Sequence, residues 1–284
     1  MSSLPASTRM GAVELAVADL PRSISYYEQA VGLQVQQRGS GEARLGAGGQ
    51  ELLRLVERLG AKPARGFSGL YHFALLLPQR ADLARWLAHA ARERVPLVGL
   101  SDHFVSEAIY LSDPDEHGIE IYWDRPREVW EGQVAKRMTT LPLDVSSLMG
   151  ELQDPASEPF EGLPAGTSMG HVHLRVSDVP ATLAFYRDAL GFDLTAAVGG
   201  QAAFLAAGGY HHHIGANTWE SAGAGQAPES SATLLRASVL LPDAQAVRAA
   251  ADSAAAAGYE PVSVADGVQI ADPSGNPLLL AHPA

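Results

Sequence analysis

The segment GAVELAVADLPRSISYYEQAVGLQV (11–35) occurs a second time, as GHVHLRVSDVPATLAFYRDALGFDL (170–194), and the two copies align without a gap. Each copy begins with the alternation of apolar and polar residues that is typical of a strand. Asp19 or Asp178 then provides a helix-start signal, an aromatic helical pattern follows, and a glycine ends the helix. Both halves of the chain therefore open with a strand and a helix.

The second parts of the two halves also repeat. GLYHFALLLPQRADLARWLAHAARERVPLV (69–98) resembles TLLRASVLLPDAQAVRAAADSAAAAGYEPV (233–262), and an Asp-Pro turn followed by a final strand closes each part. A strand, a helix and several further strands thus recur four times, which predicts an α+β fold. The four modules cover about residues 9–64 (module 1), 65–125 (module 2), 166–220 (module 3) and 230–284 (module 4).

The two halves predict two domains. We expect the first over residues 9–125, with modules 1 and 2, and the second over 166–284, with modules 3 and 4. Residues 126–165 are rich in proline, glycine and charge, a composition typical of a linker. One short helix is expected in it, near LDVSSLMGEL (143–152).

The composition limits the classes of function. The 284 residues contain no apolar run close to the roughly 18 residues of a membrane span and no secretory leader pattern, so we expect a soluble cytoplasmic protein that does not act at a membrane. The chain has no cysteine, so any metal must be held by His, Asp, Glu or carbonyl groups. The net charge of −12 disfavours nucleic-acid partners and favours a small molecule.

Three motifs resemble one known family. The first strand ending in ADL or SDV, the FYRDALGF helix and the DPSGN turn are similar to the vicinal oxygen chelate superfamily, which includes glyoxalase I, fosfomycin-resistance proteins and extradiol dioxygenases. The resemblance covers nearly the whole chain outside the linker. It implies βαβββ modules, arranged as two glyoxalase/extradiol-dioxygenase-like domains, in which two modules form a cup around a divalent metal.

The resemblance also implies which residues hold that metal. The family uses two histidines and a carboxylate: one His from the first strand of a leading module, and a His and a Glu from the first and last strands of the next module. Module 2 has His72 and Glu120 at these positions, and module 3 has His171, with His173 as a second candidate on the same face. We therefore expect a metal site formed by His72, Glu120 and His171.

This ligand set pairs module 2 with module 3, either within one chain or across a homodimer. Modules 1 and 4 carry other residues at the corresponding positions, namely Ala12, Arg236 and Leu279. Two alternatives stay open at this point. The site has decayed in both halves, or Glu14 provides the third ligand of a cup formed by modules 1 and 2.

The segment SDHFVSEAIYLSDPDEHGIE (101–120) resembles the extradiol ring-cleavage signature. His103, Tyr110, the Asp-Pro turn and Glu120 fit its spacing. Ser101 and Glu116 depart from it, the latter where the signature has a turn glycine. The resemblance implies that His103 and Tyr110 lie beside the metal as neutral groups that stabilise a developing oxyanion.

The segment GYHHHIG (209–215) contains three consecutive histidines. If it is a strand, His211 and His213 share one face and His212 lies on the other. The resemblance implies that His212 occupies the position of an acid–base histidine, a task suited to an imidazole with a pKa near ~6.5. We expect His211 and His213 to be structural.

These observations lead to one main hypothesis and two alternatives. The main hypothesis is an extradiol dioxygenase that cleaves a catechol-type ring with Fe(II) and O2, with His212, His103 and Tyr110 as catalytic residues. Mn(II) suits the same nitrogen and oxygen ligands. The alternatives are another metal-dependent lyase or isomerase of the superfamily, and a non-catalytic binding protein similar to its bleomycin-resistance members.

Overall fold

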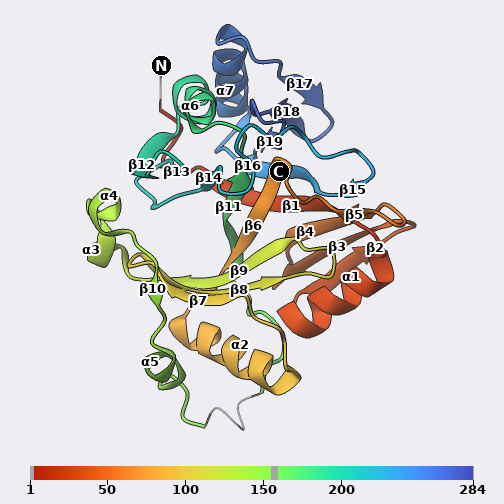
Figure 1. Cartoon of the computed structure of the whole chain (residues 1–284), viewed down its shortest axis with the longest axis vertical. Helices are drawn as coiled ribbons and strands as arrows, with labels where there is room; N and C mark the ends of the chain where they lie inside the picture. Colours follow the sequence, from red (N-terminus) through yellow and green to blue (C-terminus); the bar gives the residue numbers. More distant parts are fainter. Residues whose placement is uncertain (1–2, 155–158, 284) are drawn as a thin grey trace.

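The computed structural model describes residues 3–154 and 159–283, and it contains the four predicted βαβββ modules (Figure 1). Module 1 consists of β1 (Arg9–Val17), α1 (Leu20–Tyr26) with the π-helical turn η1 (Tyr27–Val31), β2 (Gln34–Arg38), β3 (Glu42–Ala47) and β4 (Gln50–Glu57). Module 2 consists of β6 (Gly69–Leu76), α2 (Arg80–Glu93), β7 (Gly99–Asp102), β8 (Ser106–Ser112) and β9 (Gly118–Asp124). Module 3 consists of β11 (Ser168–Arg175), α6 (Val179–Leu183) with η2 (Ala184–Ala189), β12 (Asp193–Val198), β13 (Ala202–Ala206) and β14 (Ile214–Asn217). Module 4 consists of β16 (Leu234–Leu240), α7 (Ala244–Ala256), β17 (Val262–Val264), β18 (Gly267–Ala271) and β19 (Pro277–Ala281).

Each of the two large sheets takes one module from each half of the chain. The eight-stranded sheet, in the order β17-β18-β19-β16-β1-β4-β3-β2, joins modules 4 and 1. The nine-stranded sheet, in the order β10-β7-β8-β9-β6-β11-β14-β13-β12, joins modules 2 and 3. The joining pairs, β1 with β16 and β6 with β11, are antiparallel, and β6 and β11 lie side by side in the middle of Figure 1. Modules 2 and 3 therefore meet within one chain.

Helix–turn contacts tie the two modules of each half together. The hydroxyl of Tyr27 donates a hydrogen bond to Asp113 Oδ2 (2.9 Å), and that of Tyr186 donates to Asp272 Oδ2 (3.2 Å). The other carboxylate oxygen of each aspartate accepts backbone N–H bonds within its own Asp-Pro turn. Within each half, the helix of the first module is thus hydrogen-bonded to the Asp-Pro turn of the second module. The two sheets join one half to the other.

The predicted helix signals are confirmed. Asp19 accepts a hydrogen bond from the backbone of Arg22, and Asp178 caps α6 in the same way. Gly32 follows η1 with φ 89°, the left-handed conformation in which glycine is favoured.

The linker contains more structure than its composition predicts. The expected short helix is present as α5 (Val145–Met149), and α3 (Arg127–Trp130), α4 (Val134–Arg137) and β10 (Leu141–Pro142) were not expected. β10 adds an edge strand to the nine-stranded sheet, and two short strands, β5 (Lys62–Pro63) and β15 (Ser231–Ala232), pair separately. Trp130 is buried, so this segment packs against the sheet rather than only spanning a distance.

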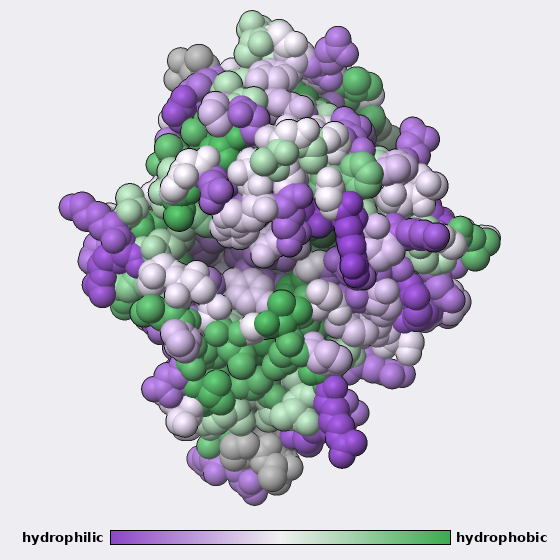
Figure 2. All heavy atoms as spheres, in the orientation of Figure 1, coloured by the Kyte–Doolittle hydropathy of each residue, from purple (hydrophilic) through white to green (hydrophobic). Residues whose placement is uncertain are grey.

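The surface in Figure 2 is mostly hydrophilic, with hydrophobic side chains gathered below the middle of this face. Among the described helices, none is long and apolar enough to cross a membrane.

Candidate metal centre

The register of three neighbouring strands brings the predicted ligands together. On the central strand β6, Ala74 lies opposite Glu120 of β9 and opposite His171 of β11. His72 precedes Ala74 by two residues and so shares its face of the sheet. One ligand atom from each of His72, Glu120 and His171 lies within 4.8 Å of the others, and among the described residues no second group of this kind is found.

The three side chains are buried, and the pKa shifts of Glu120 and His171 favour the protonation states that a metal requires. Glu120 Oε2 lies 3.0 Å from both His171 Nε2 and His72 Nε2. Burial raises the pKa of Glu120, but the two histidines outweigh it and hold that pKa well below its usual value. Burial lowers the pKa of His171. A carboxylate beside neutral imidazole is the form in which these groups bind metal.

Two nitrogens of the candidate ligands, His72 Nε2 and His171 Nδ1, are buried without a hydrogen-bond partner. His72 Nε2 lies 3.0 Å from Glu120 Oε2 without forming a hydrogen bond. An unpaired buried nitrogen costs free energy that a coordinated cation would recover. Two imidazole nitrogens and one carboxylate oxygen are the donors that divalent iron or manganese accepts. The residues present therefore fit a divalent transition metal.

The geometry does not support the alternative in which Glu14 is a ligand. Glu14 lies on β1 in the other sheet, where its Oε2 accepts a hydrogen bond from Arg236 Nε (2.9 Å) and lies 3.5 Å from Arg54 Nη1. Arg236 also forms an ion pair with Asp266 at 2.7 Å. The two sheets therefore differ in the corresponding region. The sheet of modules 2 and 3 has the candidate ligands there, and the sheet of modules 1 and 4 has an ion-pair network.

His103 and Tyr110 form a connected pair beside Glu120. Tyr110 lies opposite Glu120 across β8 and β9, and its hydroxyl is 2.7 Å from His103 Nε2. His103 Nδ1 lies 2.7 Å from the carbonyl of Thr139, which only accepts, so Nδ1 carries the proton. With that single proton on Nδ1, Nε2 carries the lone pair and accepts from the Tyr110 hydroxyl. Burial, followed by the charge of Glu120, raises the pKa of Tyr110 well above its usual value.

The prediction that His211–His213 lie in a strand with alternating faces is wrong. Strand β14 begins only at Ile214, because the chain turns at Gly208 (φ 62°) and Gly209 (φ 70°) and the next residues are not extended. Alternation requires an extended backbone, so it does not apply to the triplet.

The triplet instead divides into a pair and a single residue. His211 Nδ1 and His212 Nδ1 lie 2.8 Å apart, and the His212 ring centre is 4.1 Å from that of His171. His213 Nδ1 accepts a hydrogen bond from the backbone N–H of Ala207 at 3.2 Å. Hence His211 lies with His212 beside the candidate ligand His171, and His213 is engaged elsewhere.

Three residues near the centre were missed in the sequence. Tyr122, Tyr210 and Asp124 form a chain of hydrogen bonds, with Tyr122 Oη 2.8 Å from Tyr210 Oη and Tyr210 Oη 2.8 Å from Asp124 Oδ2. The alternation of β9 places Tyr122 and Asp124 on the same face as Glu120, a signal that could have identified them. Gly170 provides the space, because a Cβ there would lie 1.7 Å from Tyr122 Oη.

His173, the second ligand candidate of module 3, lies opposite His72 on the neighbouring strand. Its ring packs against Trp219 and Phe204, with ring centres 5.6 Å apart in each case. Its Nε2 is buried without a hydrogen-bond partner. Gly215 leaves room for this ring, since a Cβ there would lie 2.8 Å from His173 Cγ.

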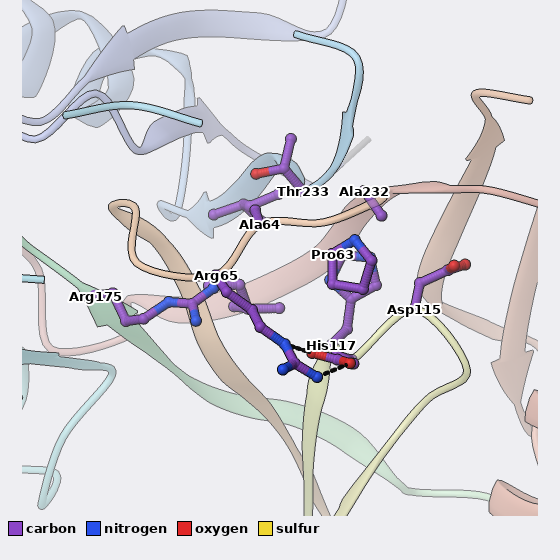
Figure 3. Close-up of a pocket in the computed structure, with 11 residues that line it drawn as sticks. Pro63, Ala64, Arg65, Asp115, His117, Arg175, Ala232 and Thr233 are labelled. Atoms are coloured by element: carbon purple, nitrogen blue, oxygen red, sulfur yellow. Dashed lines mark hydrogen bonds and ion pairs between the residues drawn. The ribbon is translucent and has the colours of Figure 1, made fainter. Parts of the chain in front are cut away.

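The unusual residue in the Asp-Pro turn occupies a glycine-like conformation. Glu116 has φ 67°, in the left-handed region that glycine adopts readily and other residues rarely. Its carboxylate pairs with Arg65, at 2.6 Å from Arg65 Nε, and this pair borders a small pocket that Asp115, His117 and Arg175 also line (Figure 3). The backbone therefore has the shape that the signature predicts, although the residue differs.

Comparisons of the sequence and of the structure with known proteins agree on one family. The model of the glyoxalase/bleomycin resistance protein/dioxygenase superfamily matches residues 9–121 and 168–280. A catechol-2,3-dioxygenase of Bacillus subtilis (strain 168) is 39% identical over 281 residues, which cover 96% of each chain. A crystal structure of a putative dioxygenase from the same species superposes with a TM-score of 0.66, at 13% identity, over 99% of this chain and 86% of that one. Glyoxalase I from Zea mays superposes with a TM-score of 0.59, at 17% identity, over 97% and 92% of the two chains.

Proposed function

The chain belongs to the glyoxalase/bleomycin resistance protein/dioxygenase superfamily, and from that premise we propose that it is an extradiol ring-cleaving dioxygenase acting on a catechol-type substrate with Fe(II) and O2. The observation that carries the proposal is the convergence of His72 and Glu120 of module 2 with His171 of module 3. The 39% identity to a catechol-2,3-dioxygenase over almost the whole chain supports it.

In this proposal His72, Glu120 and His171 hold the metal. Bound iron would supply neighbouring positions for the two catechol oxygens and for O2. Because the two histidines are neutral donors and Glu120 has one negative charge, the three ligands leave a divalent cation with one net positive charge. The site therefore favours a diol that has lost a proton.

Tyr110 and His103 stabilise the charge on the substrate oxygens. Tyr110 keeps its proton, since burial and the charge of Glu120 raise its pKa well above its usual value. We propose that its hydroxyl donates to a substrate oxygen in place of His103 Nε2, from which it lies 2.7 Å away. His103, held by the carbonyl of Thr139, positions that hydroxyl.

His212 accepts the proton that the diol loses. Its ring centre lies 4.1 Å from that of His171, next to the ligands. Burial lowers the pKa of His212 well below its usual value, and so do the neighbouring histidines. The resting ring is therefore neutral and has a nitrogen lone pair, and it holds an accepted proton more weakly than an ordinary imidazole, so that the proton is readily returned.

The test combines metal analysis with oxygen chemistry. Protein purified without oxygen and supplied with Fe(II) should retain about one iron per chain, consume O2 when catechol is added, and release a ring-opened product that contains both atoms of ¹⁸O2. Mn(II) should be tried in parallel, because the same donors accept it. Metal binding without oxygen uptake by any diol would instead favour a lyase or isomerase, and absence of metal a binding protein.

A further inference from the structure

Beyond His212 itself, a continuous line of contacts runs from its ring to a carboxylate on β9. His212 Nδ1 lies 2.8 Å from His211 Nδ1, and His211 Nε2 lies 2.8 Å from Asp124 Oδ1. His211 is completely buried and His212 is 8% exposed, so solvent does not replace these contacts. Among the described residues, no hydrogen bond is found at His212 Nε2.

The chemistry of the partners assigns the protons along this line. A carboxylate only accepts, so His211 Nε2 donates to Asp124. The other nitrogen of a neutral His211, Nδ1, then has no proton and must accept. The donor facing it at 2.8 Å is His212 Nδ1, which therefore carries the proton of that ring. Nε2 of His212 is left with the lone pair.

Two tyrosines hold the carboxylate in the accepting role. Tyr210 donates to the second oxygen of Asp124 at 2.8 Å, and Tyr122, 2.8 Å away, donates in turn to Tyr210. Both oxygens of Asp124 thus have a donor. When His211 carries a single proton, these partners set the direction of every hydrogen bond from Tyr122 to His212.

We propose that Asp124 and His211 are positioning residues that hold His212 in the tautomer whose Nε2 carries the lone pair. The inference deepens the proposed function and rests on it, since the lone pair matters because His212 is the proposed proton acceptor. With the opposite tautomer, Nε2 would carry a proton and be unable to accept one.

Asp124→Asn tests this with almost no change of shape. The amide has a single oxygen, for which Tyr210 and His211 compete. When its NH2 faces His211, Nε2 of that ring must accept, His211 Nδ1 then donates to His212, and the His212 proton moves to Nε2. We expect kcat to fall by about 10²–10⁴, the range for a mispositioned acid–base histidine, with KM and metal content nearly unchanged. Asp266→Asn, the same change in the ion pair of the other sheet, should leave kcat unaltered.

His211 offers a rescue experiment. In His211→Gln the amide N–H2 can donate to Asp124 while the amide oxygen accepts from His212 Nδ1, which preserves the tautomer. His211→Leu can do neither. We expect the Gln variant to retain at least tenfold more kcat than the Leu variant, whereas equal losses would overturn the assignment.

A spectroscopic readout separates this inference from the proposed function. In the ¹⁵N-histidine-labelled full chain loaded with diamagnetic Zn(II), ¹⁵N shifts should show His211 protonated at Nε2 and His212 at Nδ1, and Asp124→Asn should move the latter proton to Nε2. If the wild type already carries the His212 proton on Nε2, the inference is wrong even if catechol is cleaved. If catechol is not cleaved but the shifts are as expected, the proposed function fails and the tautomer assignment stands.

Discussion

Tyr27→Phe removes one hydroxyl from the helix–turn contact of the first half and leaves the ring in place. Asp113 then loses the donor at Oδ2, and its buried carboxylate keeps only the backbone N–H bonds at Oδ1. A hydrogen bond to a charged group contributes about 1.5–3 kcal/mol. Since about 1 kcal/mol shifts Tm by roughly 2–4 °C in a chain of this size class, we expect a decrease of about 3–12 °C.

The matched control is the neighbouring Tyr26, whose hydroxyl donates to the carbonyl of Ser112 at an exposed position. Water replaces that bond, so Tyr26→Phe should cost less than about 1 kcal/mol. Unfolding followed by circular dichroism in urea gives both values. Equal stabilities of the Tyr27→Phe and Tyr26→Phe proteins would refute the reasoning that a buried carboxylate depends on this hydroxyl.

The pH dependence of the same variant has a defined sign. Burial raises the pKa of Asp113, so the folded state binds its proton more readily than the unfolded state does. The ionised carboxylate therefore lowers stability at neutral pH, and this cost disappears as the pH falls through the raised folded pKa. Because protonated Asp113 needs the tyrosine hydroxyl less, the penalty of Tyr27→Phe should be largest at neutral pH and shrink on acidification.

Three further changes test the site and its turn. His171→Ala should lose bound metal in elemental analysis while Glu14→Ala keeps it, and the reverse pattern would rule out pairing of modules 2 and 3 around the metal. His212→Ala should keep its metal but lose a factor of about 10²–10⁴ in kcat, and unchanged turnover would remove its acid–base role. Glu116→Gly should be about 1 kcal/mol more stable than Glu116→Ala in urea denaturation, because only glycine relieves the left-handed backbone; equal stabilities would contradict this.

The pairing of modules 2 and 3 could be predicted because it is reflected in the residue types at the ligand positions of the four modules. At the family's ligand positions, modules 2 and 3 have His and Glu whereas modules 1 and 4 have Ala12, Arg236 and Leu279, and such complementarity has a simple cause if modules 2 and 3 share a cup. The sheet register then brings His72, Glu120 and His171 together.

The histidine triplet could not be predicted in the same way. The alternating pattern assumes extended backbone, and the turn at Gly208 and Gly209 ends that condition before the histidines begin. The contact between Asp124 and His211 joins residues 87 positions apart on different modules. No local pattern reports such a contact, so it appears only when the sheet has formed.

The joining of each sheet from both halves also affects how the chain is made. Strand β6 finds its partner β11 about a hundred residues later, and β1 finds β16 after more than two hundred. While the first half leaves the ribosome, both strands present unpaired edges, of the kind that attract other chains. Such long sequence separations slow folding, because the entropy of closing a large loop is lost before the stabilising strand contacts form. A nascent chain of this design therefore passes through a long interval in which these strand edges have no partner within the chain.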